Sequence, residues 1–77
     1  MKVNLKFFAG LRNYLPEGAS PYPAELPEGS TVRDALRAYD VPEDKPRILL
    51  VNGRHAGLDT VLGDGDLLSV FPPVAGG

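Results

Sequence analysis

Residues 67–77 read Leu67-Leu68-Ser69-Val70-Phe71-Pro72-Pro73-Val74-Ala75-Gly76-Gly77, an apolar run followed by two prolines and two glycines. The run Leu67–Phe71 is rich in strand formers and predicts a final β-strand. Pro72 and Pro73 offer no backbone N–H and hold the chain extended, so the strand must end before them. We therefore expect residues 1–71 to form one folded domain and residues 72–77 to extend from it as a tail.

The first residues of the chain predict a second strand that can lie beside the final one. Val3, Leu5 and Phe7 alternate with polar residues, the period-two pattern of a half-buried strand. This alternation turns Phe8 to the opposite face. If Leu68 and Val70 of the final strand face the core, Phe71 shares that outer face, and the two phenylalanines are expected to form an exposed docking patch.

A single helix is predicted in the middle of the chain. Thr31 and Asp34 have the spacing of a capping box, which satisfies the first free N–H groups of a helix. One apolar stripe then follows with helical spacing, at Val32, Ala35, Leu36 and Tyr39. The pattern predicts a helix of about nine residues that ends at Pro42.

Two further patterns predict the remaining strands. Ile48–Val51 is a short apolar run, expected as a central strand, and Asn52-Gly53 after it predicts a tight hairpin into a brief strand from Arg54. Residues 16–29 are rich in proline and glycine and are expected to be loop, apart from a short edge strand at Tyr22–Leu26. Leu11–Leu15 is long enough for one helical turn.

The predicted elements therefore run strand, strand, helix, strand, short strand, strand. One helix packed on one mixed sheet of four or five strands is an α+β arrangement. The first and last strands can be neighbours in the middle of the sheet only if they are parallel. This is the outline of a ubiquitin-like β-grasp fold, with the strand order taken by analogy.

Composition excludes several functional classes. The chain has 77 residues and a net charge of −2, without a basic segment that would bind nucleic acid. It has no cysteine, which excludes a disulfide, a thiolate zinc site and a cysteine nucleophile. The N-terminus lacks the apolar core of a signal peptide and no later run is long enough to span a membrane, so a cytoplasmic location is expected.

Three groups of polar residues are interpreted as structural. His55, the only histidine, is expected to be a solvated loop residue. Arg33 and Arg37 lie four apart on the outer face of the predicted helix and are expected to be solvated charges, not an anion site. The aspartates of Gly63–Asp66 lack the ligand pattern of an EF-hand loop, and a tight turn explains them better.

Several motifs resemble the MoaD/ThiS sulfur-carrier family, and most of the chain is covered. They are Lys6-Phe7-Phe8-Ala9-Gly10-Leu11-Arg12, Thr31-Val32 with Leu36, Val51-Asn52-Gly53, Asp64-Gly65-Asp66 and Val70-Phe71-Pro72-Pro73-Val74-Ala75-Gly76-Gly77. Within the family, the final run is most similar to the tail of molybdopterin synthase small subunits.

The resemblance implies a carrier that is not itself a catalyst. An E1-like adenylating enzyme (MoeB/ThiF-like) would convert the carboxylate of Gly77 to an acyl adenylate with ATP, and sulfur would then form a thiocarboxylate. No cofactor would be bound stably. A large catalytic subunit (MoaE-like) would take the sulfur for the molybdenum or tungsten cofactor.

The residues give this interpretation independent support. A carboxylate is a poor electrophile until it is activated, and the chain has no phosphate-binding loop to activate it. Without cysteine, sulfur must be carried on the terminal carbonyl carbon. The reacting residues are then Gly76 and Gly77. The residues expected to contact partners are Phe71, Phe8, Pro72, Pro73, Val74 and Arg12.

Three alternatives remain open at this stage. A sulfur carrier of thiamine thiazole biosynthesis would use the same thiocarboxylate with another acceptor, but its tail usually lacks Phe-Pro-Pro. A ubiquitin-like modifier would transfer the activated Gly77 to a lysine amine. A plain interaction module would have a tail that never reacts, and deleting Gly76 and Gly77 would then leave function intact.

Overall fold

β1 (Lys2–Phe7) and β5 (Leu67–Phe71) lie side by side as parallel strands in a computed structural model that describes residues 1–73. Their register pairs Leu5 with Leu68 and Phe7 with Val70. Parallel neighbours need a long crossover connection, and the chain between them contains the helix. The predicted pairing of the first and last strands is therefore confirmed.

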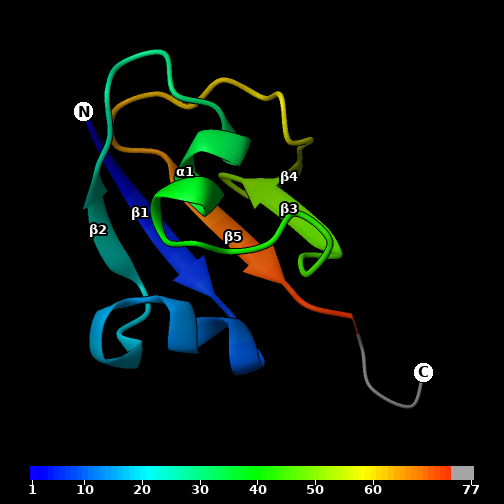
Figure 1. The fold of residues 1–77 in the computed structure, drawn as a ribbon. Coiled ribbons are helices and arrows are strands. Elements are labelled where there is room, and N and C mark those ends of the chain that lie inside the picture. The colour runs from blue at the N-terminus through cyan, green and yellow to red at the C-terminus, as the bar shows by residue number, and fades with distance from the viewer. Residues whose placement is uncertain (74–77) are drawn as a thin grey trace.

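Three shorter strands complete a five-stranded sheet in the order β2-β1-β5-β3-β4 (Figure 1). These strands are β2 (Tyr22–Glu25), β3 (Ile48–Val51) and β4 (Arg54–His55), each in antiparallel pairing. The helices are α1 (Val32–Ala38) and two 3-10 helices, η1 (Ala9–Tyr14) and η2 (Pro16–Gly18). A mixed sheet with one α-helix in this order is the ubiquitin-like β-grasp fold, so the predicted α+β class is confirmed. The predicted edge position of the second strand is also confirmed.

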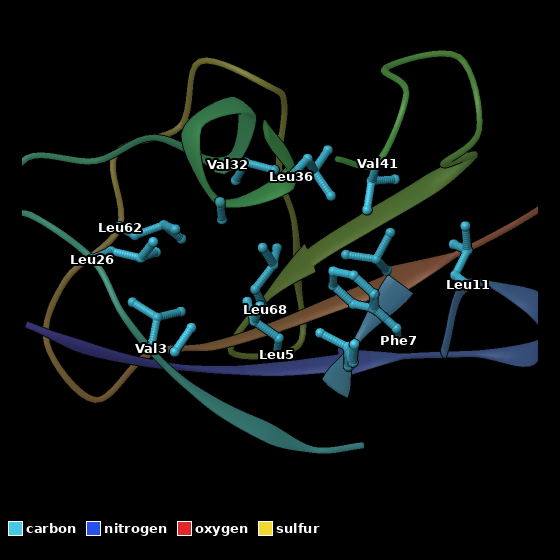
Figure 2. Close-up of a cluster of buried hydrophobic side chains, with 14 residues drawn as sticks. Val3, Leu5, Phe7, Leu11, Leu26, Val32, Leu36, Val41, Leu62 and Leu68 are labelled. Carbon is cyan, nitrogen blue, oxygen red and sulfur yellow. The ribbon is translucent and has the colours of Figure 1, made fainter. Parts of the chain in front are cut away.

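The core lies between α1 and one face of the sheet (Figure 2). Its largest fully buried side chains are Val3, Leu5, Phe7, Val32, Leu36, Leu68 and Val70. All of them were expected to point inward from the strand and helix periodicities. Because successive strand residues face opposite sides, Phe8 and Phe71 lie on the side of the sheet away from α1.

α1 begins with the predicted capping box. The Oγ1 of Thr31 accepts the backbone N–H of Asp34 at 3.3 Å, and the carboxylate of Asp34 accepts the backbone N–H of Thr31 at 2.9 Å. The backbone hydrogen bond from Thr31, followed by the hydroxyl bond, lowers the pKa of Asp34. The charged carboxylate of Asp34 therefore stabilises the first turn of α1.

α1 ends earlier than the sequence predicts. Its last helical residue is Ala38, and Tyr39 is the C-cap, so the expected length of about nine residues and the stop at Pro42 are both wrong. Asp40 takes a left-handed conformation with φ of 59°, which reverses the chain before the proline is reached. The N–H of Val41 then bonds back to a helix carbonyl at 2.9 Å, as in a Schellman motif, and its side chain is buried.

The segment after β1 is more structured than predicted. η1 starts at Ala9, two residues before the expected turn, and η2 lies in a region that was expected to be loop. Leu11 and Leu15 explain the difference, because each is only 3% exposed and anchors the segment in the core. The hydroxyl of Ser20 closes the segment by donating to the carbonyl of Phe7 and accepting its N–H, both at 3.0 Å.

The predicted hairpin between β3 and β4 is confirmed. Asn52 and Gly53 have φ values of 53° and 83°, the positive values that both central positions of this turn require. β3 lies inside the strand order, as expected for a central strand, but Ile48 is 41% exposed. The reason is that within residues 1–73 no layer covers the face of the sheet opposite α1.

The acidic loop before β5 is a turn, as predicted. A carboxylate oxygen of Asp66 accepts the N–H of Gly63 at 2.7 Å, and Asp64 accepts the N–H of Lys2 at 2.7 Å. No cluster of three or more potential metal ligands occurs among residues 1–73. The described helices are also all too short to cross a bilayer.

Candidate functional site

The face of the sheet opposite α1, here called the open face, is apolar where β5 leads into Pro72. The register places Ile48 of β3 beside Phe71 and Leu50 beside Ser69. Leu67, two residues before Ser69 in β5, lies on the same face. These side chains are half-buried or exposed, apart from Ser69, which its neighbours cover to 8% exposure. Beside the end of β5, the open face therefore presents mainly apolar side chains.

The two aromatic rings that the sequence places on this face are in contact. The centroids of Phe8 and Phe71 are 4.1 Å apart and the ring planes are inclined by 9°. Phe8 is held there because its backbone N–H donates to the carbonyl of Val70 at 3.1 Å, which continues the β1–β5 register by one residue. Their predicted position on one outer surface is confirmed, but both residues are half-buried where they were expected to be exposed, and their docking role stays a prediction.

A cation that the sequence analysis did not single out belongs to the same surface. The Nζ of Lys6 lies 5.5 Å from the ring centroid of Phe8, within the range of a cation–π interaction. Lys6 is two residues before Phe8, so strand alternation puts both on one face. This two-residue spacing is the sequence feature that indicates a positive charge beside the aromatic pair.

Pro72 and Pro73 lie along a groove of about 510 Å³. One wall belongs to η1 and the other to the loop between α1 and β3, and the remaining lining residues are Gly10, Leu11, Tyr14, Asp44 and Lys45. The end of β5 is fixed at the groove because the carbonyl of Phe71 accepts the N–H of Arg47 at 2.7 Å. The tail therefore leaves the domain between two walls, and one of these carries Asp44 and Lys45.

This second wall could not be predicted from the sequence. Asp44 and Lys45 belong to a polar loop whose composition is that of an ordinary connection. Only the pairing of β3 with β5 brings the loop to the end of β5, and that pairing is a tertiary contact.

Arg12, expected to contact a partner, has a bond within the chain. It is exposed, and its Nε and Nη2 donate to the carbonyl of Gly18 at 3.3 and 3.2 Å. The side chain also lines a smaller pocket of about 200 Å³ with Lys6 and Phe8. Arg12 thus lies at the margin of the aromatic pair, and its partner contact stays a prediction.

The other expected site residues, Val74, Gly76 and Gly77, lie outside the described residues 1–73. The path of the chain up to them is fixed by β5 and the two prolines. Their roles stay predictions from the sequence.

The charged residues on the helix side form a structural network. Arg33 pairs with Asp59 and, at 3.4 Å, with Glu43, while Arg37 pairs with Glu43 at 3.3 Å. The hydrogen bond and charge of Asp59, reinforced by Glu43, raise the pKa of Arg33. Both guanidinium groups are thus paired with carboxylates, where the sequence predicted solvated charges.

His55 is exposed on β4, opposite Leu50 in the register. It lies on a two-residue edge strand and, among the described residues, makes no side-chain hydrogen bond or ion pair. This is the solvated position that the sequence analysis expected.

Comparison with known proteins identifies the family. The model of the ThiS family matches residues 5–77. Small archaeal modifier protein 3 of Haloferax volcanii is 36% identical in an alignment that spans both chains completely.

Two solved structures have the same fold. The HVO 2177 protein of Haloferax volcanii has a TM-score of 0.79 and 37% identity, covering 100% of this chain and 87% of its own. A Pyrococcus furiosus protein assigned as molybdopterin converting factor subunit 1 has a TM-score of 0.72 and 34% identity, covering 95% and 98%. The chain therefore belongs to the ThiS family of sulfur carriers and ubiquitin-like modifiers.

Proposed function

We propose that this chain is the small, sulfur-carrying subunit of molybdopterin synthase. The observation that carries the proposal is the position of the Phe8–Phe71 pair, at the point where β5 passes into Pro72-Pro73 and the Gly-Gly end of the sequence. A docking surface thus adjoins the root of a tail that ends in residues without side chains. The relative in Pyrococcus furiosus is assigned to a molybdopterin converting factor, which supports this branch of the family.

The reacting group in this proposal is the carboxylate of Gly77. Attack of a carboxylate oxygen on the α-phosphorus of ATP forms the acyl adenylate and releases pyrophosphate. Sulfide then attacks the carbonyl carbon, a C–S bond forms, AMP leaves, and a thiocarboxylate remains. Both steps belong to a partner of the E1-like adenylating class, since the chain itself has no phosphate-binding loop and no cysteine.

The described residues would deliver this tail to two successive partners. Phe71 is held by Arg47, so the chain beyond it starts from a fixed point and direction. Pro72 and Pro73 keep the next step extended. Glycines at 76 and 77 fit a narrow channel because they carry no side chain. The open face would dock against the adenylating enzyme first and a large MoaE-like catalytic subunit second.

A second function within the family, the ubiquitin-like modifier, is favoured by one observation. The relative that matches over its whole length is named as an archaeal modifier protein. In this case the activated Gly77 would be captured by a lysine amine of another protein. The two functions share the adenylate and differ in the nucleophile that follows.

Intact mass spectrometry tests the proposal. The protein is incubated with MgATP, a sulfide donor and an E1-like adenylating enzyme, beside a control that lacks Gly76 and Gly77. We expect replacement of one oxygen by one sulfur in the full chain only. The thiocarboxylated protein should then convert the pterin precursor when the large subunit of molybdopterin synthase is added.

Other outcomes distinguish the alternatives. Sulfur loading without transfer to the large subunit, but with transfer to a thiazole-forming enzyme, would favour the thiamine carrier. Covalent adducts of higher mass on other proteins would favour the modifier. A folded chain that is never adenylated would contradict both kinds of carrier.

A further inference from the structure

Lys45 stands out among the amines of the chain because it lines the groove from which the tail leaves. The chain has only three lysines, at positions 2, 6 and 45. Lys45 is exposed, and within residues 1–73 it takes part in no ion pair. It shares the groove of about 510 Å³ with Pro72 and Pro73.

The backbone around Lys45 is fixed on both sides. Its own N–H donates to the carbonyl of Pro42 at 3.1 Å, which closes a turn. Two residues later, the N–H of Arg47 donates to the carbonyl of Phe71 at 2.7 Å. The same loop is tied to α1 through Glu43, which pairs with Arg33 and Arg37. The backbone of Lys45 is therefore anchored next to the root of the tail, and the exposed residue lines the groove.

The other two lysines are placed differently. Lys2 begins β1, and because β1 runs parallel to β5, it lies at the end of the sheet opposite to the tail. At about 3.3 Å per residue, it is about 17 Å from the far end of β1. Lys6 is nearer, but its ammonium lies over the ring of Phe8 on the open face. Only Lys45 is on the groove.

Covalent geometry allows the end of the chain to reach Lys45. Residues 74–77 separate Pro73 from the terminal carbonyl carbon, and such a segment spans at most about 13 Å. A lysine side chain adds about 6 Å, and both groups start from the same groove. A tether this short gives an effective concentration in the millimolar range.

We propose that Lys45 is a self-capture site: its amine closes an intramolecular isopeptide bond with the activated Gly77 when no sulfur nucleophile arrives. This inference rests on the proposed function, because it needs the acyl adenylate. The neutral Nζ attacks the carbonyl carbon of Gly77, a C–N bond forms, the C–O bond to phosphate breaks, AMP leaves, and the amine proton passes to solvent. No redox step is involved.

Self-capture has a regulatory consequence. The cyclised chain has no free terminus, so it can neither carry sulfur nor modify another protein. Its yield must fall as the sulfur donor increases, since both nucleophiles compete for one adenylate. A scarce sulfur supply would thus convert carriers into a closed form.

The test follows the adenylated chain without a sulfur donor. The full chain is incubated with MgATP and an E1-like adenylating enzyme of the same organism, and pyrophosphate release and hydroxylamine trapping report the adenylate. We expect a monomer lighter by one water, and a peptide map that joins Lys45 to Gly77. Lys45→Arg keeps the positive charge and should lower this product roughly tenfold or more. Lys2→Arg, at the end of the sheet opposite to the tail, is the matched control and should leave it unchanged.

The possible failures are distinct. If hydroxylamine traps the adenylate but the monomer keeps its mass, the self-capture is refuted and the carrier function stands. A bond that maps to Lys2 or Lys6, or covalent dimers alone, would also refute capture at Lys45 within one chain. If no pyrophosphate is released, the proposed function fails and self-capture fails with it.

Discussion

The rings of Phe8 and Phe71 stack at 4.1 Å between centroids, although the two residues lie near opposite ends of the chain. The contact exists because β1 and β5 are parallel neighbours and each phenylalanine extends its strand to the same level. It joins the first strand to the root of the tail on the open face, beside Pro72.

The first prediction concerns the stability of this pair. In a double-mutant cycle of Phe8→Ala and Phe71→Ala, we expect a coupling of about 0.5–1.5 kcal/mol in the free energy of unfolding, the usual range for an aromatic pair. Urea unfolding followed by circular dichroism measures it. A cycle of Phe8→Ala with Val61→Ala is the control and should be additive within about 0.5 kcal/mol. Additive behaviour of the Phe8 and Phe71 changes would contradict a stabilising stack.

The second prediction tests the open face as the docking surface. Ile48 and Val61 are both exposed apolar residues, 41% and 63% exposed, but only Ile48 lies beside Phe71. Ile48→Lys should weaken binding to the large subunit by about tenfold or more, because an unpaired charge would be buried in the interface. Isothermal titration calorimetry measures the affinity.

Val61→Lys is the matched control, since Val61 forms its bridge to Thr31 on the helix side. It should leave the affinity unchanged. Equal losses in both variants, or none in either, would place the docking surface elsewhere. Unfolding curves of both variants confirm that the domain is intact.

The third prediction concerns acid stability. Because the pKa of Asp34 is lowered below its ordinary value of 3.8 in the folded chain, the unfolded chain binds this proton first as the pH falls. The contribution of the capping box is therefore complete above pH 3.8 and is lost as the pH falls through the lower folded pKa. Melting temperatures from pH 7 to pH 2 should fall more steeply for the native chain than for Asp34→Asn. Parallel curves would show that the carboxylate does not stabilise the helix.

The fourth prediction separates two roles of Asn52. Its backbone has φ of 53°, and its side chain accepts the N–H of Leu67 and donates to Asp66, both at 2.9 Å. Asn52→Gly keeps the turn and loses the bonds, at a cost of about 1 kcal/mol. Asn52→Ala loses the bonds and strains the turn, at a cost of about 2 kcal/mol or more. Chemical unfolding gives both values, and a larger loss for the glycine variant would contradict the assignment.

Much of the fold could be predicted from local pattern. The alternation in β1, the stripe of α1, the Asn52-Gly53 turn and the stop at Pro72 each express a rule that acts over a few residues. The outer-face position of Phe8 and Phe71 also followed, because strand alternation determines the face and the β-grasp outline made the strands neighbours.

The predicted and observed structures differ where contacts between residues distant in sequence override local conformational preference. Leu11 and Leu15 are buried in the core, which winds residues 9–18 into 3-10 turns. Asp40 accepts a left-handed conformation so that Val41 can be buried, and the helix stops before its proline. Lys45 reaches the groove only through the pairing of β3 with β5. No spacing in the sequence signals such an arrangement.

The central position of β5 has a consequence for synthesis of the protein. β1 pairs with β2 on one side and with β5 on the other. A nascent chain that stops before Leu67 therefore lacks the central strand of its sheet. The sheet can close only after Leu67–Phe71 is available to pair with β1 and β3. A truncated product would be left with Val3, Leu5 and Phe7 uncovered and would be degraded or aggregate. The topology thus makes the folding of the domain depend on β5, the strand from which the tail extends.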